Sequence, residues 1–200
     1  MAKEYDRAYF EKWYRHPQTR IEQGATLERK VHLAVAAAEQ LLGRPLRSVL
    51  DVGCGEGAWY APLLKLRPRL RYVGLDPSPY AARRFGRTRN VGSGTFGDLA
   101  TLRFEEAFDL VVCSDVLHYV VTKELDRGLA GLAEMLGGMA YIEVMTIEDD
   151  PMGDLTGFHR RSAAWYAARF RRAGLLRCGM HCHIGPHFEG TIAALERAEV

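Results

Sequence analysis

The sequence predicts an α/β protein with a doubly wound, mostly parallel sheet of seven strands, helices on both faces and a C-terminal antiparallel hairpin. Three observations lead to this fold class. Short apolar runs alternate with amphipathic segments between residues 48 and 144, which is typical of βαβ units. The first apolar run enters a turn with three alternating glycines, Gly53-Cys54-Gly55-Glu56-Gly57. The chain closes with two strand-like runs joined by residues 185–189, a connection short enough for a hairpin.

Composition places the chain among ordinary globular proteins. Its 200 residues suffice for one core, so we expect a single domain over 1–200, with residues 1–43 as a helical cap on a core of residues 44–200. The formal net charge of +2 provides no strong field for nucleic acid. The four cysteines lack CxxC spacing, which favours reduced thiols. With no apolar signal region or membrane span, we expect a cytoplasmic protein. We also expect a monomer or a homodimer.

Two helices are expected before the first strand. The first runs from Ala2 to Arg15 and ends at His16-Pro17. Its aromatic residues recur at helical spacing, so this stripe either pins the helix to the domain or forms a lid over a ligand. The second helix covers Thr26–Leu42 and ends at Gly43.

The central elements alternate in type. In order we expect a strand at Ser48–Val52, a helix at Ala58–Leu66 with Pro62 in its first turn, a strand at Arg71–Asp76, a helix at Tyr80–Arg87, a strand at Thr95–Gly97, a strand at Phe108–Cys113, a helix at Lys123–Leu136 stopped by Gly137-Gly138, and a strand at Tyr141–Val144. A long acidic loop, Thr146–His159, then leads to a helix at Ser162–Ala173. The hairpin strands are expected at Leu176–Ile184 and Gly190–Leu195.

Two carboxylates flank the glycine turn. Asp51 precedes the first glycine by two residues, and Asp76 ends the next strand 25 residues later (76 − 51 = 25). A strand-end carboxylate near this spacing accepts hydrogen bonds from the hydroxyls of a nucleotide ribose. Gly53-x-Gly55-x-x-Ala58 also fits a looser nicotinamide-binding fingerprint, but the chain leaves no room for a second substrate domain.

Ordered motifs at four successive strand ends resemble the class I S-adenosylmethionine-dependent methyltransferases. They are Asp51-Val-Gly53-Cys-Gly55-Glu-Gly57, Gly74-Leu-Asp76-Pro-Ser78, Gly97-Asp98-Leu99 and Asp109-Leu-Val-Val-Cys-Ser114-Asp-Val-Leu-His118. The resemblance covers residues 48–144 and implies S-adenosyl-L-methionine as cofactor, with S-adenosyl-L-homocysteine as product. For the methionine part, it implies that Gly53, Gly55 and Gly57 let the backbone approach, that Asp51 orients that turn and the amino group, and that Ser114 lies nearby. For the adenosine part, it implies that Asp76 holds the ribose and that Asp98 and the Leu99 amide contact adenine.

The acceptor side is less specific in sequence. His118 follows the fourth strand and His159 ends the acidic loop, so each is a candidate base and each could equally be a packed or solvated histidine. We expect an acceptor pocket walled by Trp13, Tyr14, Tyr119, Phe158, His181 and His183. The His181-Cys182-His183 run also fits a metal pair, but no metal is expected, because this methyl transfer needs none.

We therefore expect methyl transfer to an O, N or C atom of a small molecule. Two alternatives stay open: a methyltransferase for RNA or other nucleic acid, and a catalytically silent protein that binds the cofactor. The arginines Arg83, Arg84, Arg87, Arg89, Arg169, Arg171 and Arg172 could form a nucleic-acid track, although such runs are more often solvated helix faces. The Asn/Asp-Pro-Pro-Tyr/Phe motif of base and glutamine methyltransferases is absent after the fourth strand.

Overall fold

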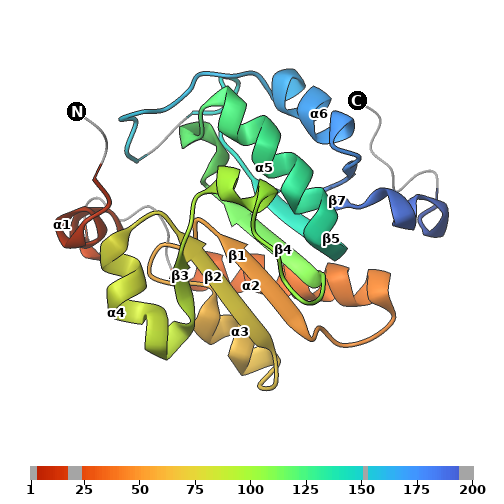
Figure 1. Cartoon of the computed structure of the whole chain (residues 1–200), viewed down its shortest axis with the longest axis horizontal. Coiled ribbons are helices and arrows are strands. Elements are labelled where there is room, and N and C mark those ends of the chain that lie inside the picture. The colour runs from red at the N-terminus through yellow and green to blue at the C-terminus, as the bar shows by residue number, and fades with distance from the viewer. Residues whose placement is uncertain (1–3, 18–23, 151–152, 194–200) are drawn as a thin grey trace.

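A computed structural model describes residues 4–17, 24–150 and 153–193, and it contains the expected seven-stranded sheet (Figure 1). The strands are β1 (Ser48–Val52), β2 (Arg71–Asp76), β3 (Val91–Ser93), β4 (Phe108–Ser114), β5 (Leu136–Glu143), β6 (Leu176–Gly179) and β7 (Cys182–Ile184). The helices are α1 (Arg7–Phe10), α2 (Gly24–Leu42), α3 (Tyr60–Leu66), α4 (Pro79–Arg89), α5 (Thr122–Met135) and α6 (Ala163–Arg172). A π-helical turn, Glu11–Arg15, continues α1, and 3₁₀ turns lie at Phe96–Ala100, Leu117–Tyr119 and Pro186–Thr191.

The strand order is β3-β2-β1-β4-β5-β7-β6. Strands β1 to β5 pair in parallel, whereas β7 runs antiparallel to both β5 and β6. The chain winds outward from β1 to β3 and then returns to place β4 on the other side of β1. The order therefore reverses between β1 and β4, and the crevice beyond their carboxyl ends is where open α/β sheets bind ligands.

The sheet is buried on both faces, so its strands are apolar throughout. Side chains alternate between two cores: Leu50 and Val111 pack with α5 and α6, whereas Val49 and Leu110 pack with α2 and α3. All five residues of β1 are buried. This includes Asp51, whose carboxyl group has to lie inside the protein for the strand to keep its place.

The third strand was predicted in the wrong place. It lies at Val91–Ser93 rather than Thr95–Gly97, and Phe96–Ala100 forms a 3₁₀ turn instead. Asn90, in a left-handed conformation, ends α4, so the chain enters the sheet directly after the helix. Thr95 and Asp98 then form a capping box that stops the strand and starts the turn.

The last part of the sheet also differs from expectation. Strand β5 begins at Leu136, so Gly137 and Gly138 lie inside a strand and do not follow a helix. The Cβ of any other residue at Gly138 would lie 2.3 Å from the carbonyl oxygen of Asp109 on β4. The hairpin is contained within the first predicted run, turning at Met180 and His181 with φ of +47° and +66°. Gly190 belongs to a 3₁₀ turn, and residues 194–195 lie outside the described residues.

The first expected helix is shorter than predicted. Its regular α-helical part covers only Arg7–Phe10, capped by the Asp6 side chain, and residues 1–3 lie outside the described residues. Figure 1 shows α1 beside α4 at one end of the molecule. Phe10 is 1% exposed and packs with Ala81 and Phe85 of α4, so aromatic packing attaches this segment to the domain. No helix within the described residues is long and apolar enough to cross a membrane.

Two glycines let α5 lie directly on the 3₁₀ turn Phe96–Ala100. A Cβ at Gly128 would lie 2.3 Å from the Phe96 carbonyl oxygen, and one at Gly131 would lie 2.2 Å from that of Leu99. These contacts involve backbone, which cannot rotate away as a side chain could. The close approach therefore sets the position of residues 96–97, which line a cavity described below.

Replacing Gly131 by alanine tests this packing. Alanine favours a helix by about 1 kcal/mol over glycine. The clash with the Leu99 carbonyl should outweigh that gain and lower the free energy of unfolding by about 1–3 kcal/mol. Chemical denaturation followed by circular dichroism measures the change. Gly24→Ala in α2 is the matched control, because nothing lies within 4 Å of a Cβ there. A Gly131→Ala protein as stable as wild type would contradict the proposed close contact.

Candidate functional site

The loops after β1 and β4 meet at Gly53. Its φ is +72°, and a Cβ there would lie 2.3 Å from Cγ2 of Val116. Glycine is thus required both for the backbone conformation and for the approach of Val116. The meeting point lies at the reversal of strand order, so the predicted glycine turn faces the crevice between β1 and β4.

Asp76 holds the glycine turn from the neighbouring strand. The Gly55 N–H donates to its Oδ2 and the Ser78 N–H donates to its Oδ1, both at 2.8 Å. The carboxyl group is 6% exposed, and burial raises its pKa against the lowering effect of these two bonds. Asp76 therefore couples the end of β2 to the turn after β1, and each oxygen still has a lone pair for a further donor.

Two adjoining cavities open around this turn. The larger, of about 350 Å³, is lined by Asp76 and by residues 95–97. The smaller, of about 230 Å³, is lined by Asp51, Ser114 and His118. Five residues line both cavities: Tyr9, Tyr14, Gly53, Asp115 and Tyr119. The two spaces are therefore parts of one cleft along the carboxyl edge of β2, β1 and β4.

The N-terminal segment covers this cleft. The Cε1 atom of Phe10 lies 3.1 Å from the position of a Cβ at Gly55, and the Ser78 hydroxyl donates to the carbonyl of Tyr5. Arg15 forms an ion pair of 2.6 Å with Glu56 in the glycine turn. Burial raises the pKa of Tyr5 to about 12, which reflects how far this residue is withdrawn from water. The aromatic stripe attaches this segment to the domain, and several of its rings also line the cleft; that it acts as a lid over a ligand stays a prediction.

Asp51 is a buried acid with few polar neighbours. It is 2% exposed, and the Tyr72 hydroxyl donates to its Oδ2 at 2.7 Å. Burial raises its pKa from 3.8 to about 7, with a further increase from nearby Asp76, although the Tyr72 bond opposes both. A cation bound in the smaller cavity would favour the ionised carboxylate. Asp51 is thus poised to change charge when such a ligand binds.

The ends of β4 and β5 share a polar network. The Ser114 hydroxyl donates to Oε2 of Glu143 at 2.6 Å, and the Lys30 ammonium of α2 lies 2.7 Å from the same oxygen. The lysine and glutamate side chains are 19% and 18% exposed. Lys30 and Ser114 thus both donate to the same oxygen of Glu143. Ser114, which lines the smaller cavity, therefore has its single proton committed away from that cavity.

The histidine candidates lie close together in the chain's fold. His118 is fully buried at the wall of the smaller cavity, with its ring centroid 4.2 Å from that of Tyr119 and 5.0 Å from that of Phe158. His159 donates its backbone N–H to the His118 carbonyl at 2.8 Å. Burial and Arg161 lower the pKa of the His159 ring. The acidic loop thus folds back onto the turn after β4, and it does so beside the cleft.

Some predicted residues support the cleft without lining it. A Cβ at Gly57 would lie 3.3 Å from Arg89, so this glycine faces α4. Asp98 accepts from the Thr95 N–H and hydroxyl, each at 2.8 Å, and these bonds lower the pKa of its carboxyl. Leu99 is completely buried beneath α5. The larger cavity is instead lined by their neighbours Thr95, Phe96 and Gly97.

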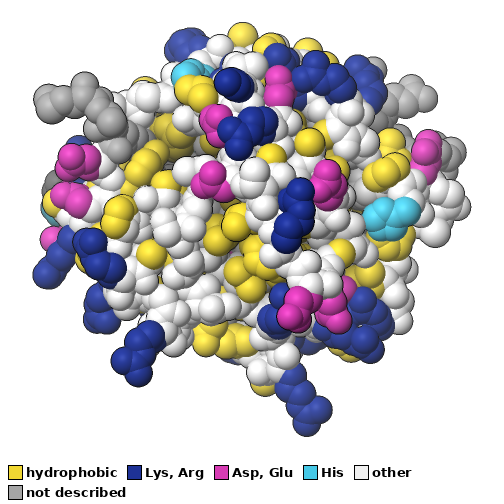
Figure 2. Space-filling view, in the orientation of Figure 1, with side chains coloured by type: hydrophobic (Ala, Val, Ile, Leu, Met, Phe, Trp, Pro, Cys, Tyr) yellow, Lys and Arg dark blue, Asp and Glu magenta, His cyan; other side chains and the backbone are white. Residues whose placement is uncertain are grey.

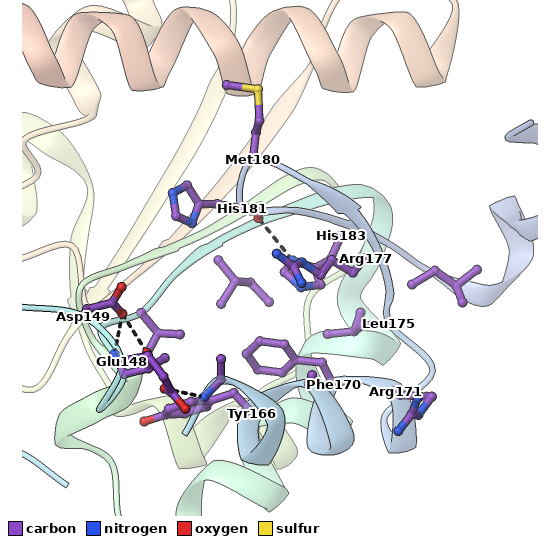
Figure 3. A pocket seen from close by; sticks show the side chains of 16 residues that line it. Glu148, Asp149, Tyr166, Phe170, Arg171, Leu175, Arg177, Met180, His181 and His183 are labelled. Carbon is purple, nitrogen blue, oxygen red and sulfur yellow. Dashed lines mark hydrogen bonds between the residues drawn. The ribbon is translucent and has the colours of Figure 1, made fainter. Parts of the chain in front are cut away.

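His181 and His183 line a separate cavity of about 460 Å³ between α6 and the β6–β7 hairpin (Figure 3). Nδ1 of His183 lies 3.1 Å from the His181 carbonyl oxygen, and Phe170 of α6 packs edge-on against its ring at 5.1 Å. Burial lowers the pKa of His183 to about 4, so the ring is neutral. The structure does not bring these two histidines to the cleft that holds Trp13, Tyr14 and Tyr119.

Several cleft residues were not singled out by sequence reasoning. Tyr9, Trp59 and Met145 line the smaller cavity, and Thr95 and Glu124 line the larger one. Asp115 was given no role within the motif after the fourth strand, yet it lines both cavities with φ at +58°. A non-glycine residue with positive φ directly after a central strand marks a functional position, but φ is not visible in sequence.

On the face in Figure 2, Lys and Arg side chains are interspersed with Asp and Glu and form no continuous basic track. No group of three or more His, Cys, Asp or Glu side chains that could hold a metal ion occurs among residues 4–17, 24–150 and 153–193.

Comparisons with known proteins point the same way. A family model described as "Methyltransferase domain" matches residues 50–139. Nodulation protein S of Rhizobium tropici is 30% identical over 116 residues, which are 56% of this chain and 48% of that protein. The chain therefore spans about half the length of this curated relative.

Solved structures share the fold. The sugar N-methyltransferase KedS8 from Streptoalloteichus sp. has a TM-score of 0.60 at 20% identity, covering 76% of this chain and 81% of its own. The O-methyltransferase NcsB1 from neocarzinostatin biosynthesis, solved with S-adenosyl-L-homocysteine and 1,4-dihydroxy-2-naphthoic acid, has a TM-score of 0.54 at 24% identity, covering 81% of this chain and 56% of its own.

The raised pKa of Asp51 predicts a pH-dependent stability. Between its unfolded value near 3.8 and its folded value of about 7, only the folded state retains the proton. Stability should therefore fall as pH rises from 4 to 7, by as much as ~4 kcal/mol, and level off above. Asp51→Asn should lose this component, and denaturation at pH 5 and pH 8 measures it. Asp150→Asn, in an exposed loop, is the control, and an Asp51→Asn profile parallel to wild type would refute the assignment.

Proposed function

We propose that this chain, whose residues 50–139 match a methyltransferase family model, is a class I S-adenosylmethionine-dependent methyltransferase that moves a methyl group from S-adenosylmethionine to a small-molecule acceptor. The observation that carries the proposal is the two-part cleft at the reversal of strand order. Asp76 lies in its larger part and Asp51 in its smaller part, and Gly53 joins them. A nucleoside and an amino-acid end joined through sulfur would need such a pair of connected spaces.

The residues present fit this cosubstrate in charge and shape. No Lys or Arg occurs among the described residues that line either cavity, while Asp51, Asp76, Asp115 and Glu124 do line them. A sulfonium and an ammonium group are cations, so this surface attracts them. The glycine turn brings backbone, not side chains, to the boundary of the two cavities.

We assign the larger cavity to the adenosine part. Asp76 would accept from the ribose hydroxyls through its remaining lone pairs, next to its bonds from Gly55 and Ser78. Residues 95–97 would border the adenine ring, and Asp98 and Leu99 would contribute through the turn that they stabilise. Gly57 would support the cofactor site indirectly, because its lack of a side chain allows α4 to pack on the glycine turn.

We assign the smaller cavity to the methionine end and the acceptor. Asp51 and Gly53 would face the amino group, and Ser114 would face the transferred methyl group. The sulfonium supplies an activated methyl group, so the protein has to align the acceptor and remove a proton where the chemistry requires it. His118 lies at this wall, and His159 is fixed to it through the backbone.

The covered cleft supports a small acceptor. Trp13, Tyr14 and Tyr119 close around a space of about 230 Å³, which admits a compact molecule or the end of a longer one. By their descriptions, one neighbour named above is a sugar N-methyltransferase, and the other is an O-methyltransferase solved with 1,4-dihydroxy-2-naphthoic acid. This range of acceptors is in keeping with a shared cofactor site and a variable acceptor side.

Asp76 provides the test of the cofactor site. Asp76→Ala should weaken binding of S-adenosylhomocysteine by about 1–3 kcal/mol, roughly fivefold to 150-fold, because the ribose loses its acceptor. The affinity of Asp76→Asn, which keeps one acceptor oxygen, should lie between those of the wild type and Asp76→Ala. Isothermal titration calorimetry measures the affinity.

Asp150→Asn serves as the control, and thermal unfolding verifies that each variant is folded. Equal affinity in wild type and a folded Asp76→Ala protein would remove Asp76 from the site. No binding by wild type at all would remove the proposed function itself.

A further inference from the structure

The cavity between α6 and the β6–β7 hairpin, called the hairpin cavity below, is separate from the cleft. Its volume of about 460 Å³ lies within the range of roughly 300–1,000 Å³ that is typical of small-molecule sites. No described residue lines both the hairpin cavity and either part of the cleft. The segment after β5 lies between them: Val144 and Thr146 line the hairpin cavity, whereas Met145 lines the smaller cavity of the cleft. The two spaces can therefore be occupied at the same time.

Much of the wall of the hairpin cavity is apolar and aromatic. Tyr166 and Phe170 of α6, Ile142 of β5 and Leu175 all line it, and all four are buried. Figure 3 shows the two α6 rings on one side of the space and the hairpin with His183 on the other. Aromatic and aliphatic walls favour a ligand with a flat, apolar body.

One polar atom of this wall has a free lone pair. His183 is 5% exposed, and its Nδ1 lies 3.1 Å from the His181 carbonyl oxygen. A carbonyl oxygen only accepts, so Nδ1 carries the proton and Nε2 keeps a lone pair. No residue among 4–17, 24–150 and 153–193 donates to this Nε2. Burial lowers the pKa of the ring to about 4, so Nε2 stays an acceptor near neutral pH.

Two arginines line the same cavity. Arg177 of β6 lies opposite His183 in the hairpin register, which places both side chains on one face of the sheet. Arg171 comes from the last turn of α6. Neither guanidinium forms an ion pair with any residue that the structure describes. Both are therefore available to an anionic group of a ligand.

Two acids line another part of the wall. Glu148 accepts from the Ala163 N–H at 3.0 Å, and Asp149 accepts from the N–H and the hydroxyl of Thr146, each at 2.8 Å. Figure 3 shows these acids across the cavity from Arg171. The cavity thus has an acidic side and a basic side, and an anionic group is attracted to the basic one.

We propose that the hairpin cavity binds a small aromatic acid that carries a hydroxyl group. Its hydroxyl would donate to Nε2 of His183, and its carboxylate would pair with Arg177 and Arg171. Its ring would lie on Tyr166 and Phe170. An ammonium group in place of the hydroxyl would be repelled by Arg177, and a second carboxylate there would meet the lone pair of Nε2. The inference goes beyond the proposed function and does not depend on it.

Matched ligands test both polar contacts. Full-length protein, with and without S-adenosylhomocysteine, is titrated near neutral pH with 4-hydroxybenzoate, 4-methoxybenzoate and 4-hydroxybenzamide, and then with the 3-substituted isomers. Nuclear magnetic resonance titration gives each dissociation constant. In at least one series the hydroxybenzoate should bind about threefold to tenfold more tightly than the methoxy compound, which lacks the donor, and than the amide, which lacks the charge.

Variants assign each contact to its residue. His183→Phe keeps a ring against Phe170 and removes Nε2, so the hydroxy and methoxy benzoates should bind within about twofold of each other. The double variant Arg171→Gln/Arg177→Gln should likewise bring the benzoate and the benzamide to within about twofold. Arg83→Gln, on the exposed side of α4, is the control for a general change in charge and should preserve both preferences.

Thermal unfolding verifies that each variant is folded, and the wild-type ligand series decides the matter if one is not. Wild type that binds no hydroxybenzoate, or that does not prefer it to the methoxy compound and the amide, would overturn the inference. A hydroxyl preference that persists in a folded His183→Phe protein would also overturn it. So would an affinity that falls as S-adenosylhomocysteine binds, because the probe would then lie in the cleft. Wild type that does not bind S-adenosylhomocysteine would remove the proposed function and leave this test intact.

Discussion

The contact between Gly53 and Val116 is the constraint on which the cleft depends. It joins the loops after β1 and β4, which are the two central strands and the ones between which the strand order reverses. A side chain at position 53 would force these loops apart. Because both cavities include Gly53 in their walls, their shape follows from this single point of backbone packing. The buried strands behind it, β1 above all, keep the contact in place.

Buried carboxyl groups give the cleft its chemical character. Asp51 and Asp76 are both nearly inaccessible, and burial raises the pKa of each. Their placement costs free energy in the empty protein, and a bound cation would offset that cost. The network of Ser114, Glu143 and Lys30 adds to this polarity, since it directs the serine proton away from the cavity. The described walls of the cleft thus carry acidic side chains and no Lys or Arg.

The cap connects ligand binding to the packing of the N-terminal segment. Phe10 belongs to the small core formed with α4, while its neighbours Tyr9 and Tyr14 line both cavities. The same few turns of the N-terminal segment therefore attach it to the domain and enclose the cleft. The ion pair of Arg15 with Glu56 fixes the far end of this segment to the glycine turn itself. Any movement of the cap would change the access of ligands to the cleft.

The sequence by itself determined the order of elements, the glycine turn and the acids at the ends of β1 and β2, because these depend on local patterns of apolar and turn-forming residues. It also indicated a doubly wound, mostly parallel sheet, since strand-like and helix-like segments alternate along the chain. Local patterns could not place β3. The left-handed conformation of Asn90 lets the strand begin at Val91, and the Thr95–Asp98 capping box turns the predicted strand region into a 3₁₀ turn. Local patterns could not locate the hairpin turn either, since two non-glycine residues, Met180 and His181, adopt positive φ after Gly179. The separation of His181 and His183 from the cleft, and the entry of Asp115 into it, were decided by tertiary packing. The Asp115 N–H donates to the carbonyl of Glu143, and the Ile142 N–H donates to the carbonyl of His181, so both positions depend on contacts with β5 between residues far apart in the chain.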